Sequence, residues 1–214
     1  MKENRIDWDE TNLQILSSMC RKCPEPHFQP RTPELPQIGC CAYEPVFTLF
    51  EIYKMVSSGE EEFFLHSIYP NPKNTVYDYE IIAGGNIHPL FYKKQPGQTE
   101  TPYERHESLK KSVSTAYLAV DERLGYTMCQ FFEEENGCGL PPAFKTSICR
   151  SFMCCSIEKA LTEEERVLLD DWRRRIREEA ETFHRKHKEV LQGKGISLGG
   201  NVLDIIGYLK QVDG

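Results

Sequence analysis

Apolar residues recur every three or four positions along four stretches of the chain, the spacing of one face of an α-helix. The first stretch ends near Gly59, the second runs from Tyr103 to Gly125, the third from Thr162 to Gly193, and the fourth follows Gly200. Each pattern predicts an amphipathic helix. The apolar positions are Leu49, Ile52, Tyr53 and Val56; Leu109, Val113, Ala116 or Tyr117, Val120 and Leu124; Leu168, Trp172, Ile176, Ala180, Phe183 and His187; and Val202, Leu203, Ile205, Ile206 and Leu209.

Helix starts are marked by capping boxes, in which a Ser or Thr is followed three residues later by Glu. Thr48 with Glu51 and Thr162 with Glu165 fit this pattern just ahead of apolar runs. A shorter helical piece from Glu60 to Tyr69 ends at Pro70. Near the N-terminus, Asp9 is a candidate cap for a helix from Glu10 to Met19 that would deliver Cys20.

Strand formers are concentrated in residues 75–92, with a break at Gly84-Gly85, which predicts a hairpin. Residues 103–125 are expected to form a helix first, followed by a strand into Cys129. The alternative is that residues 117–120 pair as a strand with residues 126–132. Residues 24–39 hold five prolines and are expected to be an extended loop.

Together these elements predict an α+β fold, mostly helical with a small strand element, in which irregular loops are organised around metal-thiolate sites. A chain of 214 residues can bury a core without disulfides. We expect residues 1–160 to form a cysteine-cluster metal-binding domain. Residues 161–214 would be a C-terminal helical extension that packs on the core or on a partner.

Charge and hydropathy narrow the classes of partner. The formal net charge of −7 argues against nucleic-acid binding, and the basic run at 173–177 is flanked by carboxylates, as on a solvated helix face. Without an apolar run of about 20 residues, no membrane span is expected. The N-terminus lacks a basic start followed by an apolar stretch, so we expect a cytoplasmic protein with reduced thiols.

Cysteine is the residue type whose placement is most unusual. Five of the nine cysteines fall within 27 residues, from Cys129 to Cys155, among glycines and prolines, and the other four lie between residues 20 and 41. An odd number fits poorly with a complete disulfide framework. Ligation of metal explains the grouping better than packing of small apolar residues does.

Cys20 and Cys23 form a C-x2-C pair, the spacing that lets a turn place two sulfurs on one ion. Cys40 and Cys41 are adjacent, and in an extended segment their side chains would point to opposite sides. They are therefore expected to serve different sites, unless one ligates and the other packs.

The histidines offer weaker candidates for ligation. His27 lies four residues after Cys23, but a loop histidine in a Pro-rich segment is the simpler interpretation. His184 and His187 are three residues apart on the predicted long helix. Because no carboxylate-histidine pattern of a bundle metal site accompanies them, we expect both to face water beside the apolar stripe.

The order of the cysteines and their neighbours resembles the YkgJ-type cysteine-cluster family, whose members are described as zinc- or iron-chelating domains and often as iron-sulfur cluster proteins. Flagellin lysine N-methylase is a relative of that family. The resemblance spans roughly residues 20–155, with an insertion between the two N-terminal cysteine pairs, Lys145-Thr146 where Arg-Pro is usual, and an extra Cys155. The matching residues are Cys20, Cys23, Cys40, Cys41, Glu51, Ile52, Cys129, Phe131, Phe132, Cys138, Cys149, Arg150, Phe152 and Cys154.

The resemblance implies a metal site more firmly than a reaction. The expected ligands are Cys20, Cys23, Cys40, Cys41, Cys129, Cys138, Cys149 and Cys154, with Arg21, Lys22 and Arg150 offsetting their negative charge and Arg150 as a cofactor-binding residue. Structural zinc sites usually use two short cysteine pairs, and this chain has only one C-x2-C. The spread of the other cysteines favours a 4Fe-4S cluster, with zinc as the alternative.

Three functions stay open at this stage. An iron-sulfur protein would transfer electrons to a redox partner or act on a small or protein substrate, including methyl transfer by analogy with the relative. A zinc protein would use its sites to hold loops together as a binding module. Catalysis by the thiol of Cys149 beside Arg150 would need a nearby base that the sequence does not indicate.

Overall fold

The computed structural model describes residues 5–134 and 136–212 and has an α+β fold that is about 51% helical. The helices are α1 (Leu49–Ser57), α2 (Glu61–Phe63), α3 (Pro102–Lys111), α4 (Ala116–Leu124), α5 (Ser147–Ser151), α6 (Cys155–Ala160), α7 (Glu163–Lys194) and α8 (Val202–Leu209). The strands are β1 (Asp7–Asp9), β2 (Gln14–Leu16), β3 (Val46–Thr48), β4 (Thr75–Val76), β5 (Glu80–Ile82), β6 (Asn86–Ile87), β7 (Thr127–Met128), β8 (Phe132–Glu133) and β9 (Gly137–Cys138).

The strands form small antiparallel sheets. β5 lies between β3 and β4, β1 pairs with β2, β6 with β7, and β8 with β9. The predicted hairpin in residues 75–92 is confirmed by β4 and β5. At the centre of the three-stranded sheet, Phe47 stands opposite Ile81, and both are fully buried.

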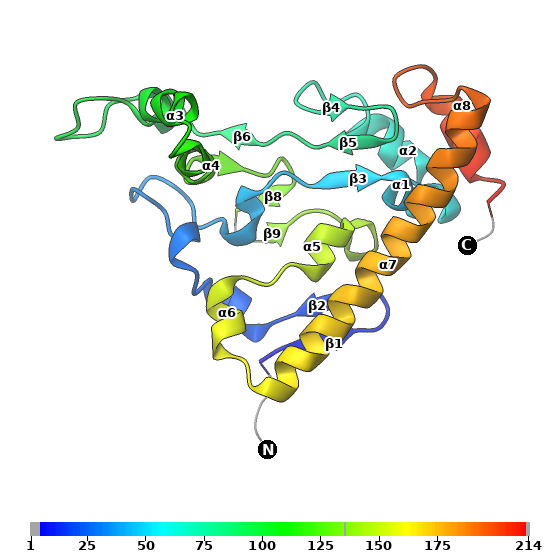
Figure 1. The fold of residues 1–214 in the computed structure, drawn as a ribbon, viewed down its shortest axis with the longest axis horizontal. Coiled ribbons are helices and arrows are strands. Elements are labelled where there is room, and N and C mark those ends of the chain that lie inside the picture. Colours follow the sequence, from blue (N-terminus) through cyan, green and yellow to red (C-terminus); the bar gives the residue numbers. More distant parts are fainter. Residues whose placement is uncertain (1–4, 135, 213–214) are drawn as a thin grey trace.

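Among the described residues the buried hydrophobic side chains form three clusters, and α7 contributes to the two larger ones. Leu191 packs with Phe47, Ile52 and α8, whereas Ile176 packs with residues around the cysteine segments. Figure 1 shows α7 running along one side of the molecule, with α3 and α4 on the opposite side. A single helix of 32 residues therefore connects the two clusters.

Both predicted capping boxes are present. The Thr48 hydroxyl accepts a hydrogen bond from Phe50 at the start of α1, while the Glu51 carboxylate accepts one from the Thr48 amide at 2.9 Å. Thr162 and Glu165 do the same for α7. The long helix ends at Gly195, whose φ of 68° lies in the left-handed region that favours glycine.

The predicted helix from Glu10 to Met19 is wrong. Asp9 accepts hydrogen bonds from the amides of Thr11 and Asn12 at 3.0 and 3.1 Å, so its carboxylate closes a turn between β1 and β2 instead of capping a helix. Leu13 has a positive φ of 47°, which reverses the chain into β2. Local side-chain bonding to the backbone competed with the helix.

The helical expectation for residues 103–125 is confirmed, but the segment divides into α3 and α4 at residues 112–115. The alternative strand pairing of residues 117–120 is wrong, because those residues lie in α4. The strand expected before Cys129 is β7, whose partner is β6.

Two details of the long helix differ from expectation. Leu169 is buried and Leu168 is 46% exposed, so the apolar stripe is shifted by one residue at its start. His187 is 4% exposed and its Nδ1 lies 2.7 Å from the Tyr208 hydroxyl, instead of facing water. The cause is tertiary, since α8 folds back and covers this face.

Across residues 5–134 and 136–212, no helix has both the length and the apolar character needed to cross a bilayer.

Candidate metal centre

The C-x2-C pair lies on a 3₁₀ turn, Ser18–Lys22, that directly follows the β1–β2 hairpin. The Ser17 hydroxyl accepts a hydrogen bond from the Met19 amide at 3.3 Å, which starts the turn. Cys20 is within the turn, Cys23 follows it, and Pro24 prevents a helix from continuing. The local sequence therefore presents both thiols from a short irregular segment.

The adjacent cysteines Cys40 and Cys41 also lie on a 3₁₀ turn, Gly39–Ala42, so the expectation of an extended segment is wrong. Gly39 has a φ of 58°, in the region that favours glycine. A β-carbon at Gly39 would stand 3.8 Å from Cys23 Sγ. The Pro-rich insertion thus loops out and returns the second pair to the first.

The third cysteine segment is attached to the second through the backbone. The Cys129 amide donates a hydrogen bond to the Cys41 carbonyl at 2.6 Å. A few residues later β8 and β9 pair, which places Cys138 opposite Phe132. These contacts hold Cys129 and Cys138 in the same region as Cys41, from which they are separated by 88 or more residues in the chain.

Six cysteines line one cavity of about 650 Å³. They come from the two N-terminal turns, from β9, and from the residue that precedes α6. Aromatic and aliphatic side chains fill the rest of its wall, including Phe28, Ile38 and Phe152. The six are Cys20, Cys23, Cys40, Cys41, Cys138 and Cys154.

Burial disfavours the thiolate form of several of these cysteines. It raises the pKa of Cys20 and of Cys129 to about 11, with smaller contributions from neighbouring thiols. It also raises the pKa of Cys149. Proton loss at such thiols would need a bound cation to compensate.

The thiols that act on one another fall into two groups. Burial is the largest cause of the raised pKa of Cys20, and Cys40, Cys154 and Cys23 raise this pKa further. For Cys129 the thiols that add to the effect of burial are Cys149, Cys138 and Cys40. We group Cys41 with Cys129 and Cys138, because both raise the pKa of Cys41, although less than Cys40 does. Cys40 acts on the pKa of thiols in both the first group (Cys20, Cys23 and Cys154) and the second group (Cys41, Cys129, Cys138 and Cys149).

Cys40 and Cys41 interact directly through their side chains. A hydrogen bond from the Cys41 thiol lowers the pKa of Cys40, and the same bond raises the pKa of Cys41. The Cys40 sulfur is thus the first of the two to lose its proton. The opposite pKa shifts of Cys40 and Cys41 agree with the different thiols that act on each of them.

The cations near the thiols are partly those that the sequence indicated. Arg21 lines the cavity. The ammonium of Lys145 contributes slightly to the lowered pKa of Cys40, and it slightly opposes the rise that burial causes in the pKa of Cys149. Arg150 instead contacts Leu13, Glu179 and the Phe50 ring. Lys145 lies four residues before Cys149 in the chain, and that proximity was the signal that could have identified it.

Two buried carboxylates position the cysteine segments, and sequence reasoning gave them no such role. Glu51 accepts a hydrogen bond from the Ser147 amide at 2.8 Å, at the start of the helix that carries Cys149. Glu25 accepts one from the Ser156 amide at 3.0 Å, at the start of α6. Both contacts join residues about 100 or more positions apart, so local patterns could not reveal them.

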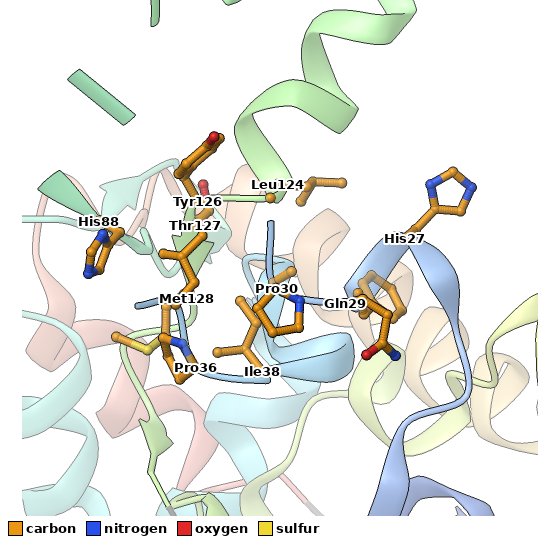
Figure 2. A pocket seen from close by; sticks show the side chains of 14 residues that line it. His27, Gln29, Pro30, Pro36, Ile38, His88, Leu124, Tyr126, Thr127 and Met128 are labelled. Atoms are coloured by element: carbon orange, nitrogen blue, oxygen red, sulfur yellow. The ribbon is translucent and has the colours of Figure 1, made fainter. Parts of the chain in front are cut away.

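His27 and Cys155 lie outside the cysteine cavity. Both line a neighbouring cavity of about 580 Å³ that shares Phe28, Phe152 and Cys154 with the first. Figure 2 shows His27 and His88 on opposite sides of a third, small pocket of about 30 Å³, whose described lining holds no cysteine. Space of that size admits about one water molecule.

Within the part of the chain that the structure describes, no three His, Cys, Asp or Glu side chains are arranged so that they could hold a metal ion together. No family model, no curated protein and no solved structure matches the chain.

Proposed function

We propose that this chain is a metal-thiolate protein that carries iron-sulfur clusters and transfers electrons to a redox partner or protein substrate. The observation that supports the proposal is the cavity lined by six cysteines from four separate segments of the chain. Packing alone gives no reason for so many thiols to surround one space. Iron-sulfur clusters are held by this donor type.

The spread of the cysteines around a wide cavity favours a cluster over a single ion. Sulfur lies about 2.3 Å from zinc, so four thiolates around one zinc ion enclose only the space of that ion. The cavity of about 650 Å³ is far larger. A cluster also accepts ligands that arrive from several directions, as the two turns, β9 and the start of α6 do here.

The two groups of thiols supply enough ligands for two clusters. Cys20, Cys23, Cys154 and Cys40 would hold one, and Cys41, Cys129, Cys138 and Cys149 the other. When bound, such a cluster accepts and releases one electron.

The rest of the chain contributes charge and shielding. Lys145 and Arg21 would offset the charge of the thiolates. Phe28, Phe132 and Phe152 give the cavity wall apolar surface. Cys20 and Cys40 are exposed residues, which would bring the first cluster within reach of a partner at the surface.

Anaerobic purification followed by iron, zinc and acid-labile sulfide analysis tests the proposal, with a visible spectrum of the same sample. We expect iron with a matching amount of sulfide and a broad absorbance that bleaches on reduction. Such a sample would then be assayed for electron transfer and for methyl transfer to a lysine peptide. Protein with neither iron nor sulfide above trace would refute the cluster.

A structural zinc protein is the second candidate, and one observation favours it. The cysteine turns contain little regular secondary structure, and residues 24–39 include only one 3₁₀ turn before Gly39. Metal binding supplies folding free energy to segments of this kind. Stoichiometric zinc without colour, together with loss of folding on chelation, would select this alternative.

A further inference from the structure

Arg150 is a fully buried cation whose hydrogen bonding is incomplete. Its Nη1 donates to the Leu13 carbonyl at 3.3 Å and its Nη2 to Glu179 at 3.5 Å, both long distances for charged hydrogen bonds. Its Nε has no partner among the described residues. Buried polar groups are nearly always hydrogen-bonded, so this guanidinium is short of negative charge and of acceptors.

An open cleft of about 770 Å³ is lined by the residues that contact this guanidinium, and the buried Arg150 itself lies behind that lining. Leu13, Phe50 and Glu179 line the cleft, and the same three residues are the contacts of Arg150. Residues of α1, the β1–β2 hairpin and α7 line the cleft, and Figure 1 shows α7 running past both α1 and the hairpin. It is separate from the cysteine cavity and shares no lining residue with it.

A second cation stands beside Arg150 at the edge of the cleft. The Lys54 ammonium lies 5.8 Å from the centre of the Phe50 ring, and the Arg150 guanidinium lies 5.7 Å from the same ring centre. Burial and then the charge of Arg150 lower the pKa of Lys54 to about 8. Each cation therefore destabilises the other, and Glu179, which is 38% exposed, compensates them only partly.

The remaining lining is largely aromatic. Phe183 packs against Tyr53 with ring centroids 4.6 Å apart and against Phe50 at 5.6 Å. His187 also lines the cleft, with its ring centroid 4.2 Å from that of Phe183, and its buried Nε2 has no hydrogen-bond partner among the described residues. Lys186 and Arg175 add positive charge at the rim, and Glu178 adds negative charge.

We propose that this cleft binds a small aromatic carboxylate. The carboxylate would lie beside Lys54, which lines the cleft, where an anion pairs with the ammonium and offsets the charge of the buried Arg150 behind the lining. The ring would lie on Phe50, Tyr53 and Phe183, where aromatic pairs add to the burial of apolar area. A cleft of this volume, mostly apolar with a few convergent charges, is typical of small-molecule sites.

Naphthalene-2-carboxylate is a suitable probe, and naphthalene-2-carboxamide is its neutral counterpart of nearly equal shape. Isothermal titration of the anaerobically purified full chain should show saturable binding of the acid. We expect the amide to bind about tenfold more weakly or worse, the factor lost with one charge-assisted hydrogen bond. Equal binding of acid and amide, or no binding of the acid, would overturn the proposal.

Variants locate the site. Lys54→Met should weaken binding of the acid about tenfold, whereas Lys111→Met, an exposed lysine on α3, should leave it unchanged. Glu179→Gln should tighten binding, because it removes a competing carboxylate, and this gain of affinity cannot result from misfolding. Unchanged affinity in both Lys54→Met and Glu179→Gln would place the probe elsewhere and refute the site.

Inorganic phosphate serves as a final arm of the titration. Phosphate that competes with the acid at equal concentration would show a simple anion site and overturn the aromatic part of the proposal. Failure of phosphate to compete would support it. These measurements do not depend on which metal the cysteines hold.

Discussion

The amide of Cys129 donates a hydrogen bond to the carbonyl of Cys41 at 2.6 Å, and this contact joins the two cysteine regions of the chain. The thiols of these two residues also belong to the same group around the proposed second cluster. Because the bond is between main-chain atoms, it fixes the spacing of the two segments whatever the side chains bind. Substituting single cysteines can therefore test ligation without removing this connection.

If each group of thiols holds its own cluster, Cys154→Ser and Cys138→Ser should each lower the iron and sulfide content by about half. Cys155→Ser is the matched control, since Cys155 lies outside the cysteine cavity and should not alter the content. The measurement is iron and sulfide per chain after anaerobic purification. Complete loss in both variants would indicate a single shared site.

Glu51→Gln should destabilise the fold by about 2 kcal/mol, because a buried carboxylate with three donors becomes an amide with one acceptor oxygen. Those donors are the amide and hydroxyl of Thr48 and the amide of Ser147. Urea unfolding gives the free energy.

Glu104→Gln is the control for this substitution. Glu104 has the same local bonds to Thr101 but is exposed at the start of α3. Its replacement should cost less than about 0.5 kcal/mol. Equal costs for the two variants would mean that the Ser147 contact contributes nothing.

Lys54→Met should stabilise the protein at neutral pH, and the gain should fall as pH rises. The folded pKa of Lys54 is about 8, lowered by burial and by Arg150 from 10.5. Between these values the unfolded chain binds more protons than the folded chain, so the wild-type protein gains stability with rising pH. Below pH 8 the wild-type protein bears the full free-energy cost of burying the charged Lys54, and the Lys54→Met variant does not.

The check is the difference in Tm between Lys54→Met and wild type from pH 7 to 10.5. It should be largest below the folded pKa and approach zero at the top of the range. Lys111→Met should show no such trend. A difference that stayed constant across the range would contradict the burial of a charged Lys54.

Leu191→Ala should cost about 2 to 5 kcal/mol, the range for a buried leucine that leaves a cavity. Leu191 is fully buried where α7 meets the core formed by α1 and α8. Leu203→Ala on α8 is the control, since that side chain is 62% exposed and its loss should cost about 0.5 kcal/mol or less. Thermal or urea unfolding distinguishes the two.

The local sequence determined the elements whose signals lie within a few residues. The capping boxes at Thr48 and Thr162, the amphipathic stretch that became α8, and the breaks at prolines depend on hydrogen bonds and periodicity over one or two turns. The type of donor at the candidate metal centre was equally readable, because thiols in such number and grouping are rare. The α+β class followed from these elements.

Only the tertiary structure decided which distant groups meet. The turn at Asp9 replaced a predicted helix, α8 buried His187, and the loop of residues 24–39 returned Cys40 to Cys23. Arg150, expected beside the thiols, contacts Glu179 on α7 and the ring of Phe50 on α1. Each outcome depends on packing between segments far apart in the chain, and the energy of such contacts leaves no periodic mark in the sequence.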